Sequence, residues 1–214
     1  MPKPQTPLKS KNAAYLWTFV GVNFAIFFAV TIGSHVDYSS IQHFWQRISA
    51  KNGFVAVCMP LLVVVLNGIL SDVAKARLVF WHWENPLPGC RAFSVLIHTD
   101  PRIDVARLKE KHGPLPRAAK EQNSLWFGLY KKHSASVTVS DSHRLYLLTR
   151  DMAAMSALFV IPFSSLALFS SSNTQIAGIY TSALVIQFAL VATAARNYGN
   201  RFVKNVLTEE SHSK

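Results

Sequence analysis

The chain has 214 residues, half of them hydrophobic and 15% charged, and its formal net charge is +11. The apolar residues are gathered in long blocks, a pattern that excludes an ordinary soluble domain and indicates a membrane protein. The positive charge flanks these blocks, as is typical of membrane proteins, and no recognised nucleic-acid-binding motif accompanies it. The composition therefore disfavours a nucleic-acid partner.

Four of the apolar blocks match the length of a membrane span. A helix needs about 20 residues to cross a hydrocarbon core of about 30 Å. The predicted spans are residues 13–33, 53–70, 152–170 and 176–195. The segments outside them are a basic tail (1–12), a loop (34–52), an insertion (71–151) and a C-terminal tail (196–214). The sequence predicts an all-α membrane protein with four transmembrane helices in two hairpins and a small, mainly helical cytoplasmic insertion between the second and third.

Three amides and two prolines lie inside the predicted spans. Asn23 and Gln187 fall at similar depth, which favours a hydrogen bond between the first and fourth helices, and Asn67 is a further candidate for an interhelical contact. Pro60 and Pro162 each remove a backbone hydrogen bond, so a kink is expected at both. The spans contain no Asp, Glu, Lys, Arg or His. This disfavours an ion-coupled or proton-coupled transporter.

The loop 34–52 carries a short amphipathic pattern. Four apolar residues recur at helical spacing with polar residues between them, namely Ile41, Phe44, Trp45 and Ile48. A short helix with aromatic residues on its apolar stripe, placed between two spans, is typical of an interfacial anchor. We expect it to lie flat on the outer face of the bilayer.

The Lys and Arg residues are distributed unevenly. Of the 22, the N-terminal tail holds three, the loop 34–52 two, the insertion thirteen, the turn at 171–175 none and the C-terminal tail four. Because cytoplasmic segments carry the excess of Lys and Arg, we expect a multi-pass inner-membrane protein with both termini and the insertion in the cytoplasm. Contact with anionic lipid headgroups then accounts for the high net charge.

The insertion contains signals for several helices. Asp100 as N-cap and Pro101 at the first helical position predict a short helix ending at Lys111. Residues 134–139 are interpreted as an extended linker. A helix beginning at about Ser142 is expected to lead without interruption into the third span.

Residues 117–132 form a further predicted helix with one apolar face. This face must dock on a neighbouring helix, on the bilayer or on a partner protein. We assign partner docking to Leu125, Trp126, Leu129 and Tyr130. The C-terminal tail is expected to fray after a short helical extension to Val206.

The motifs of common enzymes are absent from the sequence. We find no phosphate-binding glycine loop, no G-x-S-x-G, no H-E-x-x-H and no paired C-x-x-C. The best enzyme-like set is His82, Glu84, Cys90, His98 and Asp100, with His112 and His143 nearby in sequence, because Cys with His can form a nucleophile or a metal site. Nothing in the spacing requires this chemistry, so the sequence predicts no catalytic residue, metal or cofactor.

Three classes of function fit these features. The leading hypothesis is a non-enzymatic membrane protein that forms a homo-oligomer and anchors a small basic cytoplasmic module for binding a protein partner or a ligand. The second is a pore-forming or membrane-perturbing effector. In topology the chain resembles small membrane effectors of bacterial antiphage defence, an architectural analogy without a shared motif. The third is a membrane enzyme or metal-binding protein that uses His82, Cys90, His98 and Asp100.

Overall fold

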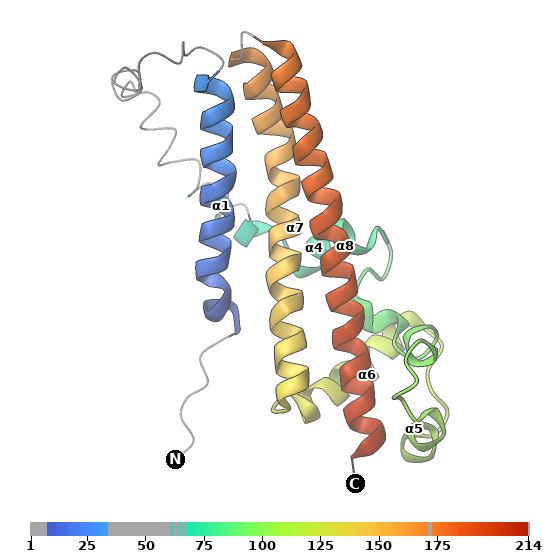
Figure 1. Ribbon diagram of the computed structural model, residues 1–214. Coiled ribbons are helices and arrows are strands. Elements are labelled where there is room, and N and C mark those ends of the chain that lie inside the picture. Colours follow the sequence, from blue (N-terminus) through green and yellow to red (C-terminus); the bar gives the residue numbers. More distant parts are fainter. Residues whose placement is uncertain (1–7, 34–60, 62–64, 66, 171–172, 214) are drawn as a thin grey trace, which may run out of the picture.

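The computed structural model describes residues 8–33, 61, 65, 67–170 and 173–213, and the secondary-structure elements of these ranges are all helical. Three long helices stand side by side, and shorter ones pack beside one end of this bundle (Figure 1). In chain order the elements are α1 (Leu8–Gly33), α4 (Asp72–Phe80), the 3-10 turns η1 (Pro88–Arg91) and η2 (Leu96–His98), α5 (Val105–His112), α6 (Ala119–His133), α7 (Val137–Ser170) and α8 (Thr174–His212).

Three helices are long and apolar enough to cross a membrane. Their candidate spans are Lys11–Thr31, Val137–Phe169 and Thr174–His212. Twelve of the eighteen residues of the predicted span 53–70, including Pro60, lie outside the described residues, and so does the whole predicted interfacial anchor formed by Ile41, Phe44, Trp45 and Ile48. The count of four spans therefore stays a prediction.

Helices α7 and α8 are longer than a bilayer is thick. With 34 and 39 residues they extend about 50 and about 58 Å, compared with a hydrocarbon core of about 30 Å. The charge-free part of α7 begins after Asp151, and that of α8 ends before Arg196. Each helix thus has an apolar half, which packs with α1, and a polar half. The polar halves pack with α4, η1, η2, α5 and α6 in a compact unit that we call the helical module.

The apolar half exposes large hydrophobic side chains. Ile161 and Ile179 are 76% and 68% exposed, and Phe169 is 89% exposed. Water-facing surfaces seldom gather so many large apolar groups, whereas lipid tails solvate them without cost. This exposed belt supports a membrane-embedded bundle.

Aromatic rings fill the interior of the apolar half. Phe24 and Phe27 of α1 contact Phe163 of α7, with ring centroids 4.9 and 4.8 Å apart, and Phe159 stacks on Phe163 at 4.9 Å. All four side chains are buried. Each such pair contributes roughly 0.5–1.5 kcal/mol beyond its area, so together they hold α1 against α7.

A polar contact crosses this apolar interior. The Gln187 Nε2 donates to Asn23 Oδ1 at 3.0 Å and lies 3.4 Å from Ser156 Oγ. Asn23 in turn donates to the Phe19 carbonyl of its own helix at 2.9 Å. The two amides that the sequence places at similar depth are therefore in contact, and their hydrogen bonds join α1, α7 and α8.

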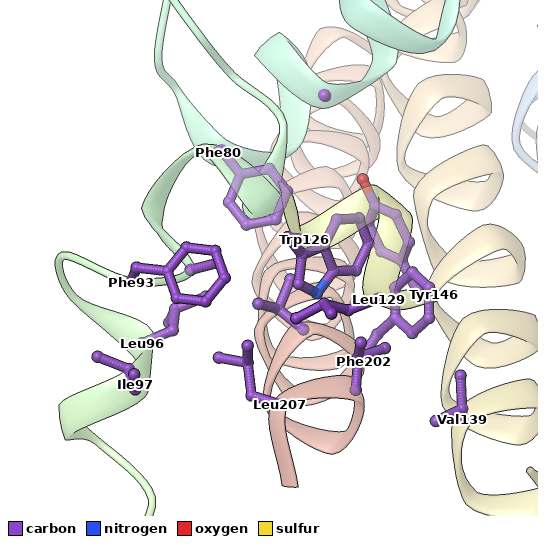
Figure 2. Close-up of a cluster of buried hydrophobic side chains, with 14 of the residues drawn as sticks. Phe80, Phe93, Leu96, Ile97, Trp126, Leu129, Val139, Tyr146, Phe202 and Leu207 are labelled. Atoms are coloured by element: carbon purple, nitrogen blue, oxygen red, sulfur yellow. The ribbon is translucent and has the colours of Figure 1, made fainter. Parts of the chain in front are cut away.

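The core of the helical module is formed where α6 packs on α8. Trp126 meets the Phe202 ring edge to face, with centroids 5.1 Å apart, and Leu129 and Leu207 lie beside them (Figure 2). Gly199 of α8 permits the close approach of α4 on another side of the helix, because a Cβ added there would lie 2.8 Å from the Phe80 ring. The C-terminal part of α8 is thus the centre of the module.

A buried carboxylate fastens the end of α8. Glu210 is 1% exposed and lies 2.8 Å from the Lys132 Nζ and 3.0 Å from the His112 Nε2, and it is also paired with His133. These partners belong to α5 and α6. Because a buried carboxylate is costly without partners, the arrangement fixes both short helices to α8.

The loop before α5 is tied to α8 by a second ion pair. The Arg102 NH2 donates to Asp100 Oδ2 at 2.8 Å and to Asn205 Oδ1 at 3.2 Å. The hydrogen bonds from Arg102 hold the pKa of the Asp100 carboxyl at about 2, and Lys204, 4.0 Å away, acts in the same direction. The charged form of Asp100 therefore stabilises the fold.

The structure corrects three predictions made for the polar segments. The helix expected from Asp100 begins at Val105, because Asp104 is the N-cap and its side chain accepts a hydrogen bond from the Arg107 amide. The second half of the linker expected at 134–139 is helical, since α7 begins at Val137 and buries Val139 in the module core. The C-terminal tail does not fray after Val206: α8 continues to His212, held by the Glu210 contacts.

The amide contact can be measured with a double-mutant cycle. Asn23→Leu and Gln187→Leu should each lower the free energy of unfolding in detergent, and their coupling energy should be about 0.6–1.7 kcal/mol, the range of hydrogen bonds between membrane helices. Gln175→Leu, at an exposed position of α8, is the matched control and should show no coupling with Asn23→Leu. Additive effects of the two core substitutions would contradict the contact.

The low pKa of Asp100 predicts a stability loss in acid. Above about pH 4 the carboxylate is ionised in both the folded and unfolded states, so its stabilisation is complete; as the pH falls toward about 2 the unfolded state takes up the proton first and the stabilisation is lost. Because Arg102 is half-exposed, we expect a contribution on the order of 1 kcal/mol. Thermal unfolding of the wild type and Asp100→Asn should differ near neutral pH and converge in acid; a gap that persists in acid would contradict the assignment.

Candidate functional site

Three buried charges and one exposed carboxylate are linked where the apolar half meets the helical module. Lys75 of α4 contacts Asp151 of α7 with an Nζ–Oδ1 distance of 2.9 Å, and these side chains are 5% and 9% exposed. Arg150 lies 3.2 Å from the same Asp151 oxygen and 2.9 Å from Asp72 of α4. Two cations and two carboxylates thus neutralise one another. Since a buried charge without a partner is strongly destabilising, this set fixes α4 against α7.

A pocket of about 370 Å³ opens beside these charges. Its volume falls in the range of small-molecule sites, roughly 300–1,000 Å³. Its walls come from four helices and η1 and are mostly aromatic or apolar. They are formed by Asp72, Leu87, Pro88, Asn123, Trp126, Phe127, Tyr130, His143, Tyr146, Leu147, Arg150 and Phe202. We call this site the aromatic pocket.

Stacked rings make the walls of the aromatic pocket rigid. His143 stacks on Phe202 with centroids 4.5 Å apart and planes 7° apart, and Trp126 stacks on Tyr130 at 6.0 Å and 15°. The Tyr130 hydroxyl lies 3.1 Å from His143 Nδ1, which links the two stacks. Burial raises the pKa of Tyr130, so this hydroxyl keeps its proton at neutral pH. The pocket is therefore pre-formed and suited to a flat apolar molecule.

One end of the aromatic pocket is polar. Tyr146 is 5% exposed, and its hydroxyl, which points away from Phe202 in Figure 2, is buried. The Arg150 guanidinium lies over the Tyr146 ring, with its Cζ 5.8 Å from the centroid. Asp72, the partner of Arg150, is 66% exposed at its side chain. An anionic group entering the pocket can therefore compete with Asp72 for Arg150.

The face predicted to dock a partner is largely covered by this chain. Trp126 and Leu129 are buried in the module core, and Leu125 and Tyr130 pack at its edge. Trp126 and Tyr130 also line the aromatic pocket. Helix α8 therefore covers much of the apolar face of α6, for which the sequence allowed a neighbouring helix, the bilayer or a partner protein.

The two remaining residues singled out within the predicted spans, Asn67 and Pro162, do not belong to the aromatic pocket. Asn67 is 7% exposed, its Oδ1 has no partner within the described part of the chain, and it lines a different cavity. Pro162 lies inside α7, which continues on both sides of it. The Ser165 hydroxyl donates to the Ile161 carbonyl at 2.8 Å beside it. A kink at Pro162 stays a prediction.

The enzyme-like set does not form a metal site. His82 and His98 are exposed, Asp100 is paired with Arg102, and Cys90 is buried. Burial raises the pKa of the Cys90 thiol, which disfavours the thiolate that a nucleophile needs. Over the described ranges, no group of three or more His, Cys, Asp or Glu side chains is placed to hold a metal ion.

Sequence reasoning missed the polar end and half of the ring system of the aromatic pocket. His143, Tyr146 and Arg150 follow one another at helical spacing, so they share a face of α7, and this pattern was available in the sequence. Phe202 carried no such signal, because it was assigned to a short, fraying tail. Its role depends on α8 continuing into the module.

Comparison of the chain with protein-family models, with curated proteins and with solved structures gave no match.

Proposed function

We propose that this chain is a membrane-anchored, non-enzymatic binding protein whose helical module recognises a small, flat aromatic acid. The aromatic pocket carries this proposal. Its stacked walls suit a planar ring, and its polar end holds the Arg150 guanidinium, whose partner Asp72 is exposed. A ligand with a ring at one end and a carboxylate at the other matches both parts of the site.

We further propose an inner-membrane location with the helical module and both termini in the cytoplasm. The distribution of Lys and Arg supports this orientation, because twenty of the 22 flank the same side of the predicted spans. Asp151 and Arg196 mark where the charge-free parts of α7 and α8 stop, which sets the proposed membrane boundary at the level of α4.

Ligand binding would alter the contact between α4 and α7. Arg150 is shared between the buried Asp151 and the solvent-accessible Asp72. A ligand carboxylate that takes the place of Asp72 removes one of the ion pairs that hold α4. In this proposal α4, which follows the predicted second span directly, is the element that reports binding to the membrane or to a protein partner.

The pore-forming alternative finds less support in the packing. Phenylalanine rings and the Asn23–Gln187 contact occupy the interior of the three described spans. A water-filled path would therefore have to form between several copies of the chain, as a homo-oligomer.

Binding of aromatic acids tests the proposal. In ligand-observed NMR with the detergent-purified chain, indole-3-acetate and 2-naphthoate should bind, and their uncharged amides should bind about tenfold more weakly because they lack the charge that Arg150 pairs with. Asp72→Asn should strengthen binding of the acids several-fold, since it removes the competing carboxylate without touching the rings.

Two variants serve as controls for this experiment. Tyr130→Ala, in the pocket wall, should abolish binding, whereas Trp83→Ala, at an 81% exposed aromatic outside the pocket, should leave it unchanged. Equal binding of acids and amides, or no gain with Asp72→Asn, would contradict the assigned role of Arg150. Absence of binding to any of these compounds would contradict the proposed ligand class.

A further inference from the structure

Helix α4 lies along the proposed membrane surface. In its N-terminal half, Lys75 contacts Asp151, the last charged residue before the apolar part of α7, at 2.9 Å. At its C-terminal end, the Val79 carbonyl accepts hydrogen bonds of 3.2 and 3.0 Å from the Nε and Nη2 of Arg196, the first charged residue after the apolar part of α8. Both halves of α4 are therefore at the same level of the bundle, near the middle of α7 and α8 (Figure 1).

Two tryptophans project from the C-terminal end of α4. Trp81 has a φ of 55°, in the left-handed region that bulky residues seldom adopt, and this conformation turns the chain out of the helix. The Arg196 guanidinium lies over the Trp81 ring, with its Cζ 4.6 Å from the centroid, and the Arg77 Nε donates to the Trp83 carbonyl at 3.0 Å. Arginines thus hold the turn, yet the two tryptophans are 61% and 81% exposed.

The level of these indoles indicates contact with lipid headgroups. Tryptophan is enriched at the membrane–water interface, because its ring is apolar and its N–H is a hydrogen-bond donor. Trp81 lies at this level through its contact with Arg196. The neighbouring His82 and Glu84 are exposed and polar, and burial of such groups among acyl chains is costly. The segment therefore fits the headgroup layer and not the hydrocarbon core.

The cations beside the indoles complement lipid phosphates. The Arg77 side chain is exposed, and that of Arg196 is partly exposed. Arg196 uses two of its five N–H donors on α4, which leaves others for an anion. Desolvation and then the charges of Arg91 and Arg196 lower the pKa of the His82 imidazole, so a positive potential reaches this segment.

We propose that residues 81–83 anchor the helical module to the adjacent bilayer surface. In this arrangement Trp81 and Trp83 insert into the headgroup layer, and Arg77 and Arg196 pair with phospholipid phosphates. The anchor holds α4 at the membrane surface and so fixes the depth of the module. The inference rests on the proposed level of the bilayer, but not on the ligand of the aromatic pocket.

Fluorescence quenching tests the anchor. The full chain is placed in phosphatidylcholine nanodiscs with or without a lipid that carries a nitroxide on its headgroup. The other tryptophans are common to the wild type and the Trp81→Phe, Trp83→Phe double variant, so the difference between their emissions reports the two indoles. The nitroxide lipid should quench most of this difference, and acrylamide in the water should quench little of it. Strong quenching by acrylamide without quenching by the lipid would place the indoles in water and overturn the proposal.

A tryptophan in the water-facing part of the module is the matched control. Ala106 is exposed on α5, which lies at the end of the module far from the apolar half (Figure 1). Ala106→Trp, introduced into the double variant, should be quenched by acrylamide and not by the nitroxide lipid. Equal quenching of this residue and of the native pair by the lipid would overturn a specific place for the pair in the headgroup layer.

Two arginine variants test the contact with phosphate. Arg196→Gln should reduce quenching by the nitroxide lipid, because Trp81 loses the cation stacked on it and the adjacent phosphate partner. Arg201→Gln, at an exposed position further along α8, should leave quenching at the wild-type level. Unchanged quenching in Arg196→Gln would overturn the role of this residue.

Binding of aromatic acids separates the anchor from the aromatic pocket. Neither Trp81 nor Trp83 lines that pocket, so the double variant should bind the acids as the wild type does, which also shows that it is folded. Absence of acid binding in both proteins would contradict the proposed ligand and leave the quenching result intact. Loss of acid binding in the double variant alone would overturn the assignment of the two tryptophans to the membrane surface.

Discussion

The ion pair between Lys75 and Asp151 is the contact on which the arrangement of this molecule depends. Asp151 is the last charged residue before the apolar half of α7, and Lys75 places α4 against it at the same level. Neither charge can be buried alone, so the pair is stable only when α4 crosses α7 at this point. Arg150 extends the contact to Asp72. The position of α4 in turn shapes the aromatic pocket, whose lining includes Asp72.

Helices α7 and α8 run without a break from the apolar half into the helical module, so the module is a direct extension of the apolar half. A flexible linker would let a ligand-binding unit move independently of its anchor, but here the same two helices pass from phenylalanine packing into the module core. Phe202 and Glu210 belong to the helix that carries Gln187, and Tyr146 belongs to the helix that carries Phe163. A change in packing in the helical module is therefore transmitted through α7 and α8 to the apolar half, without a separate domain interface.

The sequence predicted the features that depend on composition and on spacing along one helix. Charge-free blocks predicted the apolar helices, and similar depth in the bilayer brought Asn23 together with Gln187. It did not predict contacts made by residues distant along the chain. The stack of His143 on Phe202 and the burial of Glu210 against α5 and α6 require α8 to extend far beyond its apolar part, whereas polar composition alone suggested a frayed tail. The four-span count and the interfacial helix rest on the sequence alone, because the described residues do not include them.

Asp72 and Asp151 hold Arg150 from two sides, and of these two carboxylates only Asp72 is exposed. In the proposed function an acid in the aromatic pocket competes with Asp72 for Arg150, whereas the buried Lys75–Asp151 pair stays in place. The contact between α4 and α7 would therefore loosen at one ion pair only, because the other is buried.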